Sequence, residues 1–224
     1  MTDITKIALT GGPCAGKSSA VPYLTARLAA HGVEVIAVPE QATALMSSGK
    51  TPENMGSAAF HSLLFGNQLA AEEAAEKKAR ESAAKKVLIL CDRGLLDSRA
   101  YVSAVEFAQY AGAYGFTEAK IRNRYDAVLH MVTAADGAEN AYTIQNNTVR
   151  AEDARQAREL DETILCLWVG TQHLRVIDNR SHFDDKLSRL LEEVLAVLGL
   201  PEPLEIERKF LIEHPDLTML QSMK

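Results

Sequence analysis

The sequence predicts an α/β fold in which helices cover both faces of a parallel β-sheet. Two observations lead to this prediction: short apolar runs alternate with longer helical stretches, and distinctive polar residues directly follow several of the apolar runs. Parallel strands need helical crossovers between them, and strands that are buried on both faces are continuously apolar. Ligands bind at the carboxyl ends of such strands, so the polar residues there form the candidate site.

Five short apolar runs are the expected strands. They are rich in branched aliphatic residues and are bounded by turn signals or by helical stretches. The expected strands are Lys6–Thr10, Val33–Val38, Val87–Cys91, Ala127–Val132 and Leu174–Ile177.

The segments between these runs carry apolar residues at helical spacing or are rich in Ala, Glu, Lys and Leu, which are strong helix formers. The longest of them is expected to form one helix or two in tandem. The expected helices are Ser18–Ala30, Ser57–Lys86, Ser98–Tyr110, Thr117–Arg124, Ala151–Trp168 and Asp184–Leu198.

Composition limits the classes of function. The 224 residues are 47% hydrophobic, enough for a core, and carry a net charge of −6. An acidic chain is not expected to bind nucleic acid or an anionic membrane broadly, although a small basic pocket for phosphates is compatible with it. No apolar run approaches the roughly 20 residues of a membrane span, and no signal segment is apparent. A cytoplasmic protein is expected, and its oligomeric state is left open.

Cysteine and histidine spacing predicts neither a disulfide framework nor a metal centre. Cys14, Cys91 and Cys166 are scattered along the chain. Cys91 ends an apolar run and Cys166 lies among Leu and Trp, so both are expected to be buried small hydrophobic residues. The histidines are interpreted as structural or surface residues; they are His31, His61, His130, His173, His182 and His214.

A glycine-rich turn follows the first expected strand. Residues 11–18 read Gly-Gly-Pro-Cys-Ala-Gly-Lys-Ser, which fits the phosphate-binding loop (P-loop) pattern G-x-x-x-x-G-K-[ST]. Glycines let backbone N–H groups approach a phosphate chain closely, and the following helix directs its positive end at the phosphates. A plain turn that caps a helix is the alternative, but a strand before the loop and a helix after it favour nucleotide binding.

The P-loop supplies most of the expected nucleotide contacts. Lys17 reaches the β- and γ-phosphate oxygens, and the Ser18 hydroxyl can ligate Mg²⁺. The expected nucleotide-binding residues are Gly11, Gly12, Pro13, Cys14, Ala15, Gly16, Lys17, Ser18, Ser19 and Asn179. Asn179 follows the last strand, where it can read the edge of an adenine or guanine base or can simply form a turn.

The sequence around the third and fifth strands favours a small-molecule kinase over other P-loop classes. Regulatory GTPases carry an Asn-Lys-x-Asp loop, whereas the nearest segment here is Asp178-Asn179-Arg180-Ser181. They also carry Asp-x-x-Gly after the third strand, whereas Asp92 is followed by Arg-Gly-Leu. Motor-type ATPases have a tandem acidic pair, and here a single acid precedes an arginine.

Three residues at strand ends are candidates for the chemistry. Asp92 is placed like a Walker B carboxylate that ligates Mg²⁺, or else it is a turn acid. Glu40 is a candidate base or positioning group for an acceptor hydroxyl, or else an exposed acid before a helix. Arg93 can contact the acceptor or the γ-phosphate, or can form an ion pair with a nearby carboxylate. Asp97 either orients an arginine or begins a helix.

A charged helix carries further arginines. Arg150, Arg155 and Arg158 lie before and within it, and can close over a phosphate as a lid. A solvated surface helix with i,i+4 ion pairs explains the same pattern. The long polar approach from Tyr142 favours a lid.

Four segments together resemble one P-loop family. They are Gly11–Ser18, Val38–Ala42, Cys91–Ser98 and Asn147–Glu152. The family is the ATPase-like domain shared by bacterial nicotinamide riboside kinase/NAD regulator proteins and TRPL-translocation-defect proteins, and the resemblance covers roughly residues 6–198. It implies the P-loop nucleoside triphosphate hydrolase fold of the nucleoside/nucleotide-kinase branch, with strand order 2-3-1-4-5. It also implies an acceptor and metal site at Glu40 and Asp92-Arg93, and a lid from Arg150.

The tail carries a second resemblance. After a linker at 200–203, residues 205–209 read Glu-Ile-Glu-Arg-Lys, similar to the opening strand of triphosphate tunnel (CYTH) domains. Residues 1–199 are expected to form the P-loop domain and 204–224 the truncated start of a CYTH-like domain, too short to close a barrel. An amphipathic edge strand is the alternative.

The expected function is Mg-ATP-dependent phosphoryl transfer to a small hydroxylated acceptor, with nucleoside-like compounds among the candidates. ATP and Mg²⁺ are the expected cofactors, with GTP as an alternative nucleotide. Two other functions stay open. One is a nucleotide-binding regulatory module with slow or no turnover, and the other is part of a longer triphosphate-tunnel enzyme.

Overall fold

A computed structural model shows the fold of the chain and describes residues 2–142 and 153–200. The sheet is parallel and five-stranded, in the order β2-β3-β1-β4-β5. This arrangement confirms the predicted fold class and strand order. The strands are β1 (Asp3–Thr10), β2 (Val33–Val38), β3 (Lys86–Asp92), β4 (Ala127–Met131) and β5 (Leu174–Ile177).

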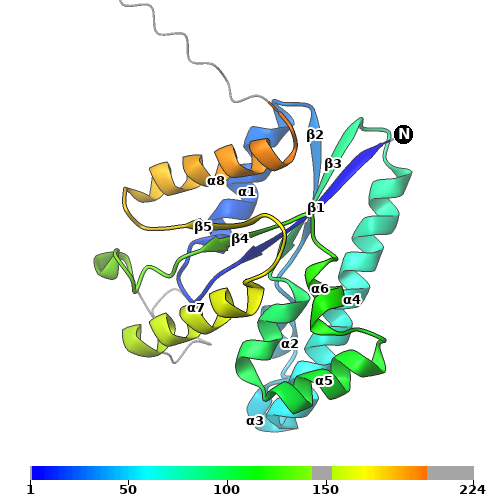
Figure 1. Cartoon of the computed structure of the whole chain (residues 1–224), viewed down its shortest axis with the longest axis vertical. Coiled ribbons are helices and arrows are strands. Elements are labelled where there is room, and N and C mark those ends of the chain that lie inside the picture. The colour runs from blue at the N-terminus through cyan, green and yellow to red at the C-terminus, as the bar shows by residue number, and fades with distance from the viewer. Residues whose placement is uncertain (1, 143–152, 201–224) are drawn as a thin grey trace, which may run out of the picture.

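Helices connect the strands and pack on both faces of the sheet (Figure 1). The α-helices are α1 (Lys17–Ala29), α2 (Gln41–Ser47), α3 (Pro52–Met55), α4 (Ser57–Glu81), α5 (Ala104–Ala113), α6 (Glu118–Arg122), α7 (Ala154–Trp168) and α8 (Phe183–Val197). Two 3₁₀ helices are η1 (Leu95–Tyr101) and η2 (Glu139–Ala141).

The core has two layers because successive strand side chains point to opposite faces. On one face, Ile7 and Leu9 of β1 pack with residues of α1 and α8. On the other face, Ala8 packs in a cluster that includes residues of α4, α5 and α7. The same alternation divides β3, so both layers are anchored on the central strands.

The strand register brings the carboxyl ends of the central strands to one edge of the sheet. Leu9 pairs with Asp92, Thr10 pairs with His130, and Val38 pairs with Cys91. The loops that leave β1, β2 and β3 therefore start side by side. This register is what brings the P-loop, Glu40 and Arg93 together.

Several sequence expectations differ from the structure. The long helix expected to end at Lys86 ends at Glu81, and Lys86 begins β3. The helix expected over Ser98–Tyr110 is instead η1 followed by α5, because Ser103 and Glu106 form a capping box that starts a new helix. No bounds were predicted for the short helices α2 and α3, although a helix directly after Glu40 was one of the alternatives for that residue. Cys166 is exposed instead of buried.

The prediction that Cys166 is buried was wrong because of the side of α7 on which this residue lies. Ala157, Asp161, Ile164 and Trp168 form the buried stripe of that helix. Cys166 lies two positions from both Ile164 and Trp168, and residues two apart face different sides of a helix. Apolar neighbours in the sequence therefore did not indicate burial.

Within the described ranges 2–142 and 153–200, no helix combines the length and apolar character needed to cross a membrane. The chain from residue 201 onward lies outside the described residues. The structure therefore does not test the expected domain boundary near residue 199, the linker or the CYTH-like start. Those expectations stay predictions.

Candidate functional site

The P-loop turns sharply between β1 and α1, and its glycines permit the turn. Gly11 has φ +136°, and a Cβ atom there would lie 2.0 Å from the carbonyl oxygen of Met131. Gly16, the N-cap of α1, has φ +95°, and a Cβ there would lie 2.5 Å from the ring of Phe183. Both positions exclude side chains on conformational and steric grounds. The backbone can thus follow the tight path that a phosphate cradle requires.

Lys17 is buried beneath this turn. Its Nζ atom donates hydrogen bonds to the carbonyl oxygens of Gly11, at 2.8 Å, and Gly12, at 2.9 Å. The amine therefore lies within the concave side of the P-loop at the amino-terminal end of α1, where the helix dipole adds positive potential. This concentration of positive charge is what a polyphosphate needs.

Side chains from two later segments, α7 and the loop after β4, hold the P-loop in place. The Gly12 N–H donates to Oδ1 of Asp161, which lies on the buried face of α7. Thr133, just after β4, donates to the carbonyl oxygen of Pro13. Burial alone would raise the pKa of Asp161, but hydrogen bonding and charge from His130, with the Gly12 N–H, lower it. The Asp161 carboxylate thus stays ionised as an acceptor for the P-loop.

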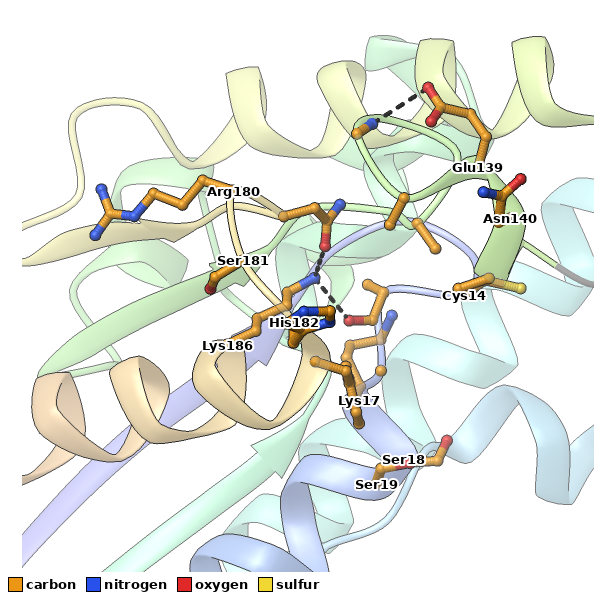
Figure 2. A pocket seen from close by; sticks show the side chains of 18 of the residues that line it. Cys14, Lys17, Ser18, Ser19, Glu139, Asn140, Arg180, Ser181, His182 and Lys186 are labelled. Atoms are coloured by element: carbon orange, nitrogen blue, oxygen red, sulfur yellow. Dashed lines mark hydrogen bonds between the residues drawn. The ribbon is translucent and has the colours of Figure 1, made fainter.

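Lys186 reaches the P-loop from α8, as Figure 2 shows. Its Nζ donates to the carbonyl oxygens of Ala15, at 3.1 Å, and Val132, at 2.7 Å, and to Oδ1 of Asn179, at 2.7 Å. Burial lowers the pKa of Lys186 to about 8, although the negative charge of Asp161 opposes the shift. Lys186 thus links α8, the loop after β5 and the P-loop.

Asn179 lines the same cavity, but its side chain is engaged in the scaffold. Its Nδ2 donates to the carbonyl oxygens of Thr133, at 2.8 Å, and Asp136, at 2.6 Å. Because its Oδ1 also accepts from Lys186, the amide has little capacity left for a base edge. The geometry favours the turn-forming interpretation of Asn179.

Asp92 and Ser18 are the residues of the larger cavity whose chemistry fits Mg²⁺. Both line the large cavity at the P-loop. Oδ1 of Asp92 is buried and has no hydrogen-bond partner among the described residues. Burial raises the pKa of Asp92, Lys17 opposes this and Glu40 adds to it. A buried carboxylate oxygen without a partner among the described residues, in the same cavity as a hydroxyl, suits Mg²⁺, which takes few protein ligands and completes its shell with phosphates and water.

The described residues contain no cluster of three or more His, Cys, Asp or Glu that could hold a metal by itself. The metal chemistry predicted here does not require one, since the nucleotide brings oxygen ligands of its own.

Glu40 and Arg93 form an ion pair beside the P-loop. Nε of Arg93 donates to Oε1 of Glu40 at 2.6 Å, and its Nη1 donates to the carbonyl oxygen of Gly11 at 3.2 Å. Nη1 also lies 3.6 Å from the buried carboxylate of Asp97. Asp97 in turn accepts from the Thr10 hydroxyl and from the indole N–H of Trp168. Asp97 therefore orients Arg93, one of the two roles expected for it.

The ion pair changes what Glu40 can do. Burial alone would raise the pKa of Glu40, but the charge and hydrogen bond of Arg93, with a hydrogen bond from Thr43, lower it to about 2. A carboxylate with so low a pKa is a weak general base near neutral pH. It remains a strong hydrogen-bond acceptor, so the geometry favours a positioning role.

Two cavities meet at Glu40. The larger, of about 1170 Å³, is lined by the P-loop, Asp92, η2 and the loop between β5 and α8. The smaller, of about 350 Å³, is lined by α2, α3, α4 and η1, with Arg93 and Asp97 at its polar end. Glu40 lines both cavities. A group bound in one therefore lies close to a group bound in the other.

Four ring side chains line the smaller cavity, called here the aromatic cavity: Phe60, His61, Phe65 and Tyr101. The His61 ring stacks on Tyr101, with centroids 5.4 Å apart and an interplanar angle of 18°, and Phe60 packs edge-on against His61. Burial lowers the pKa of His61, although Glu106 opposes the shift, so the ring is neutral at pH 7. The cavity combines flat apolar walls with a charged end, as ligand sites commonly do.

The described part of the chain does not place the expected lid arginines at the larger cavity. Arg150 lies outside them. The Arg155 side chain is 81% exposed and pairs with Glu159, and Arg158 donates to the carbonyl oxygen of Ala135. Neither Arg155 nor Arg158 lines the larger cavity as the described part of the chain forms it. These contacts match a solvated surface helix, and the lid stays a prediction.

Sequence reasoning missed Asp161, Lys186 and His61 as site residues. Asp161 and Lys186 lie within amphipathic helices, where charged residues are usually solvated. The available signal was an acid or a lysine in phase with apolar positions, such as Asp161 with Ile164 and Trp168. His61 carried no such signal, because its role depends on packing against Tyr101.

Comparison with known proteins identifies the family of the domain. A family model described as AAA domain matches residues 6–186, which include the P-loop, Glu40 and Asp92-Arg93. Comparison with curated proteins gives no significant match. The match supports a P-loop domain that binds a nucleotide, with kinase-like or NTPase-like chemistry. Because this family model covers most of the sheet and the complete P-loop, the chain belongs to the AAA domain family.

Proposed function

We propose that the chain is a Mg-ATP-dependent phosphotransferase that acts on a small hydroxylated acceptor. The observation that supports this most is the position of Glu40, in the wall shared by the P-loop cavity and the aromatic cavity. A hydrolase needs only the first cavity and a water molecule. A second cavity with a polar end at the shared wall favours transfer to an organic acceptor.

Each charged residue has a role that its contacts support. Lys17 offers a cation to the phosphates, and Asp92 with Ser18 would hold Mg²⁺, which neutralises charge on the transferred group when bound. Glu40 accepts a hydrogen bond from the acceptor hydroxyl and so orients its oxygen. Arg93 holds Glu40 and stays cationic close to Gly11 of the P-loop. The acceptor oxygen bonds to the γ-phosphorus as the bridging P–O bond breaks, and the hydroxyl proton is released.

A weak base is compatible with this reaction. The transition state of phosphoryl transfer is loose, so positioning and charge stabilisation contribute more than proton abstraction. The ion pair between Glu40 and Arg93 supplies both. The stacked faces of His61 and Tyr101 favour an acceptor with a flat ring, which makes nucleoside-like alcohols the first compounds to test.

The test is a screen of nucleosides, nucleotides and small alcohols for acceptor-dependent ADP release. Wild type should release ADP with at least one acceptor, and Lys17→Ala should abolish the release. Lys77→Ala, which changes an exposed lysine of α4, is the matched control and should behave like wild type. If Lys17→Ala left the transfer intact, the proposal would be wrong. Strict GTP binding with no acceptor phosphorylation would favour a regulatory module instead.

A further inference from the structure

Arg93 has an unusual backbone conformation for the residue that holds Glu40. Its φ is +77°, in the left-handed region that residues other than glycine rarely adopt. Its amide N–H still continues the sheet ladder by donating to the carbonyl oxygen of Leu9 at 3.0 Å. A residue in this region keeps its conformation only if the surrounding structure holds it there.

Two buried side chains hold the turn on either side of Gly94. Nε2 of Gln68, on α4, donates to the carbonyl oxygen of Arg93 at 3.1 Å. The hydroxyl of Tyr125 accepts from the N–H of Leu95 at 2.8 Å. The backbone groups that flank the turn are thus both bound by side chains from other elements.

Both side chains converge on one oxygen of Glu72. Oε1 of Glu72 accepts from Nε2 of Gln68 at 3.1 Å and from the hydroxyl of Tyr125 at 2.6 Å. Its other oxygen accepts from Lys6 Nζ at 3.0 Å, and Arg124 Nη2 lies 3.3 Å from it. Glu72 is 0% exposed, so these partners are what compensates its burial.

The protonation of Tyr125 suits this arrangement. Burial, with the negative charge of Glu72 beside it, raises the pKa of Tyr125 well above its usual value. The phenol therefore keeps the proton that it donates to Glu72, while its oxygen accepts from Leu95. Gln68 likewise needs no change of protonation to bridge Glu72 and Arg93.

We infer that Gln68, Glu72 and Tyr125 act as positioning residues for Arg93, a set called here the Glu72 clasp. The inference rests on the proposed function, because it gives the clasp the task of aiming the guanidinium at Glu40 and at the Gly11 carbonyl oxygen. A merely structural network would stabilise α4 against the sheet without acting on Arg93. The clasp instead binds the carbonyl oxygen of Arg93 and the amide of Leu95, so its loss frees the turn between them.

The first measurement is the NMR resonance of the Arg93 Nε–H group, which reports its bond to Glu40 without requiring any activity. Tyr125→Phe and Gln68→Leu should each shift or broaden this resonance. Tyr110→Phe is the matched control, since it removes another buried hydroxyl, which lies 3.2 Å from the Ser98 hydroxyl and outside the Glu72 clasp. It should leave the resonance in place. If Tyr125→Phe does not fold, Gln68→Leu carries the test.

The second measurement is kinetic. Tyr125→Phe should lower kcat for phosphoryl transfer by about fivefold to tenfold, the usual effect of one lost hydrogen bond. The dissociation constant of this variant for ATP should change by a smaller factor than its kcat. In an Arg93→Ala background Tyr125→Phe should lower kcat no further, because the residue through which it acts is gone.

An unchanged Arg93 Nε–H resonance in both folded variants would overturn the inference, whatever the activity. An equal loss of kcat with and without Arg93 would also overturn it, since it would show a structural role. If wild type phosphorylates no acceptor, the proposed function fails, while the resonance still decides whether the Glu72 clasp positions Arg93.

Discussion

Arg93 Nε lies 2.6 Å from Glu40 Oε1, and Arg93 lines the aromatic cavity while Glu40 lines both that cavity and the one at the P-loop. This ion pair joins the loop after β2 to the loop after β3, two neighbouring strands of the sheet. It also fixes the charge state of Glu40. The most direct consequences of the structure therefore concern this pair and the contacts that hold the P-loop.

The ion pair predicts an acid-dependent loss of stability. The pKa of Glu40 in the folded protein is about 2, below the ordinary value of 4.5. A depressed pKa stabilises the folded state above the unfolded pKa, and this contribution is lost as the pH falls from about 4.5 to about 2. At pH 7 wild type should exceed Glu40→Gln in free energy of unfolding by about 3 kcal/mol. Urea denaturation at pH 7, 4 and 3 measures the difference, which should shrink with pH.

The control is Glu81→Gln, at an exposed position of α4. Its difference from wild type should stay small at every pH. A difference for Glu40→Gln that is constant from pH 7 to pH 3 would contradict the assigned ion pair.

Lys186 leads us to predict a second rise of stability with pH, in the alkaline range. Its pKa in the folded protein is about 8, below the ordinary 10.5, and its side chain is buried with the residue 2% exposed. The unfolded chain thus binds more protons than the folded one between these values, so stability rises with pH there. Relative to Lys186→Met, wild type should gain up to about 3 kcal/mol between pH 8 and pH 10. Thermal or urea unfolding of both proteins measures this gain in stability. A gain of zero would contradict the lowered pKa of buried Lys186.

Because Asp161 of α7 binds the Gly12 N–H, we predict that this helix affects the affinity of the P-loop for a nucleotide. Asp161→Ala leaves the Gly12 N–H without its acceptor, and an unsatisfied buried donor costs about 1–3 kcal/mol. ATP affinity should fall about tenfold or more as the P-loop loses its shape. Glu162→Ala, at the next and exposed position of α7, is the control. Calorimetric titration with ATP measures both, and equal affinities for the two variants would argue against this support.

From the position of Asp92 we predict how ATP binding and phosphoryl transfer depend on Mg²⁺. Its Oδ1 atom, which has no hydrogen-bond partner in the described part of the chain, is the expected protein ligand together with the Ser18 hydroxyl. Asp92→Asn should lower acceptor phosphorylation by at least about a hundredfold, since a bound metal contributes several kcal/mol to transition-state stabilisation. The variant should bind ATP in EDTA like wild type but lose the effect of added Mg²⁺. A full magnesium effect in Asp92→Asn would place the metal elsewhere.

Local signals in the sequence predicted the sheet and the P-loop well. Strand β3 is a continuous apolar run because it is buried on both faces, and the glycines of the P-loop occur at fixed spacing because the backbone path demands them. The placement of Glu40 and Asp92-Arg93 at strand ends followed from the parallel topology. These features depend on a few neighbouring residues, so a linear pattern records them.

Contacts between distant segments were not predictable in the same way. Asp161 meets Gly12 across 149 positions in the chain, and Glu72 meets Tyr125 across 53. Neither residue type nor spacing marks such pairs before helices are docked on the sheet. The low pKa of Glu40 likewise depends on the Arg93 guanidinium, which reaches Glu40 from the loop after another strand.

In the proposed function, the γ-phosphoryl group of ATP passes from the P-loop cavity to an acceptor in the aromatic cavity. Incubation with ATP labelled at the γ-phosphate, in the presence of each acceptor, measures it by counting label on the acceptor and label released as inorganic phosphate. The structure predicts that wild type places most of the label on the acceptor. Glu40→Gln should lose this transfer while still binding ATP. Label found only as inorganic phosphate with every acceptor, or equal transfer by Glu40→Gln, would contradict the claim.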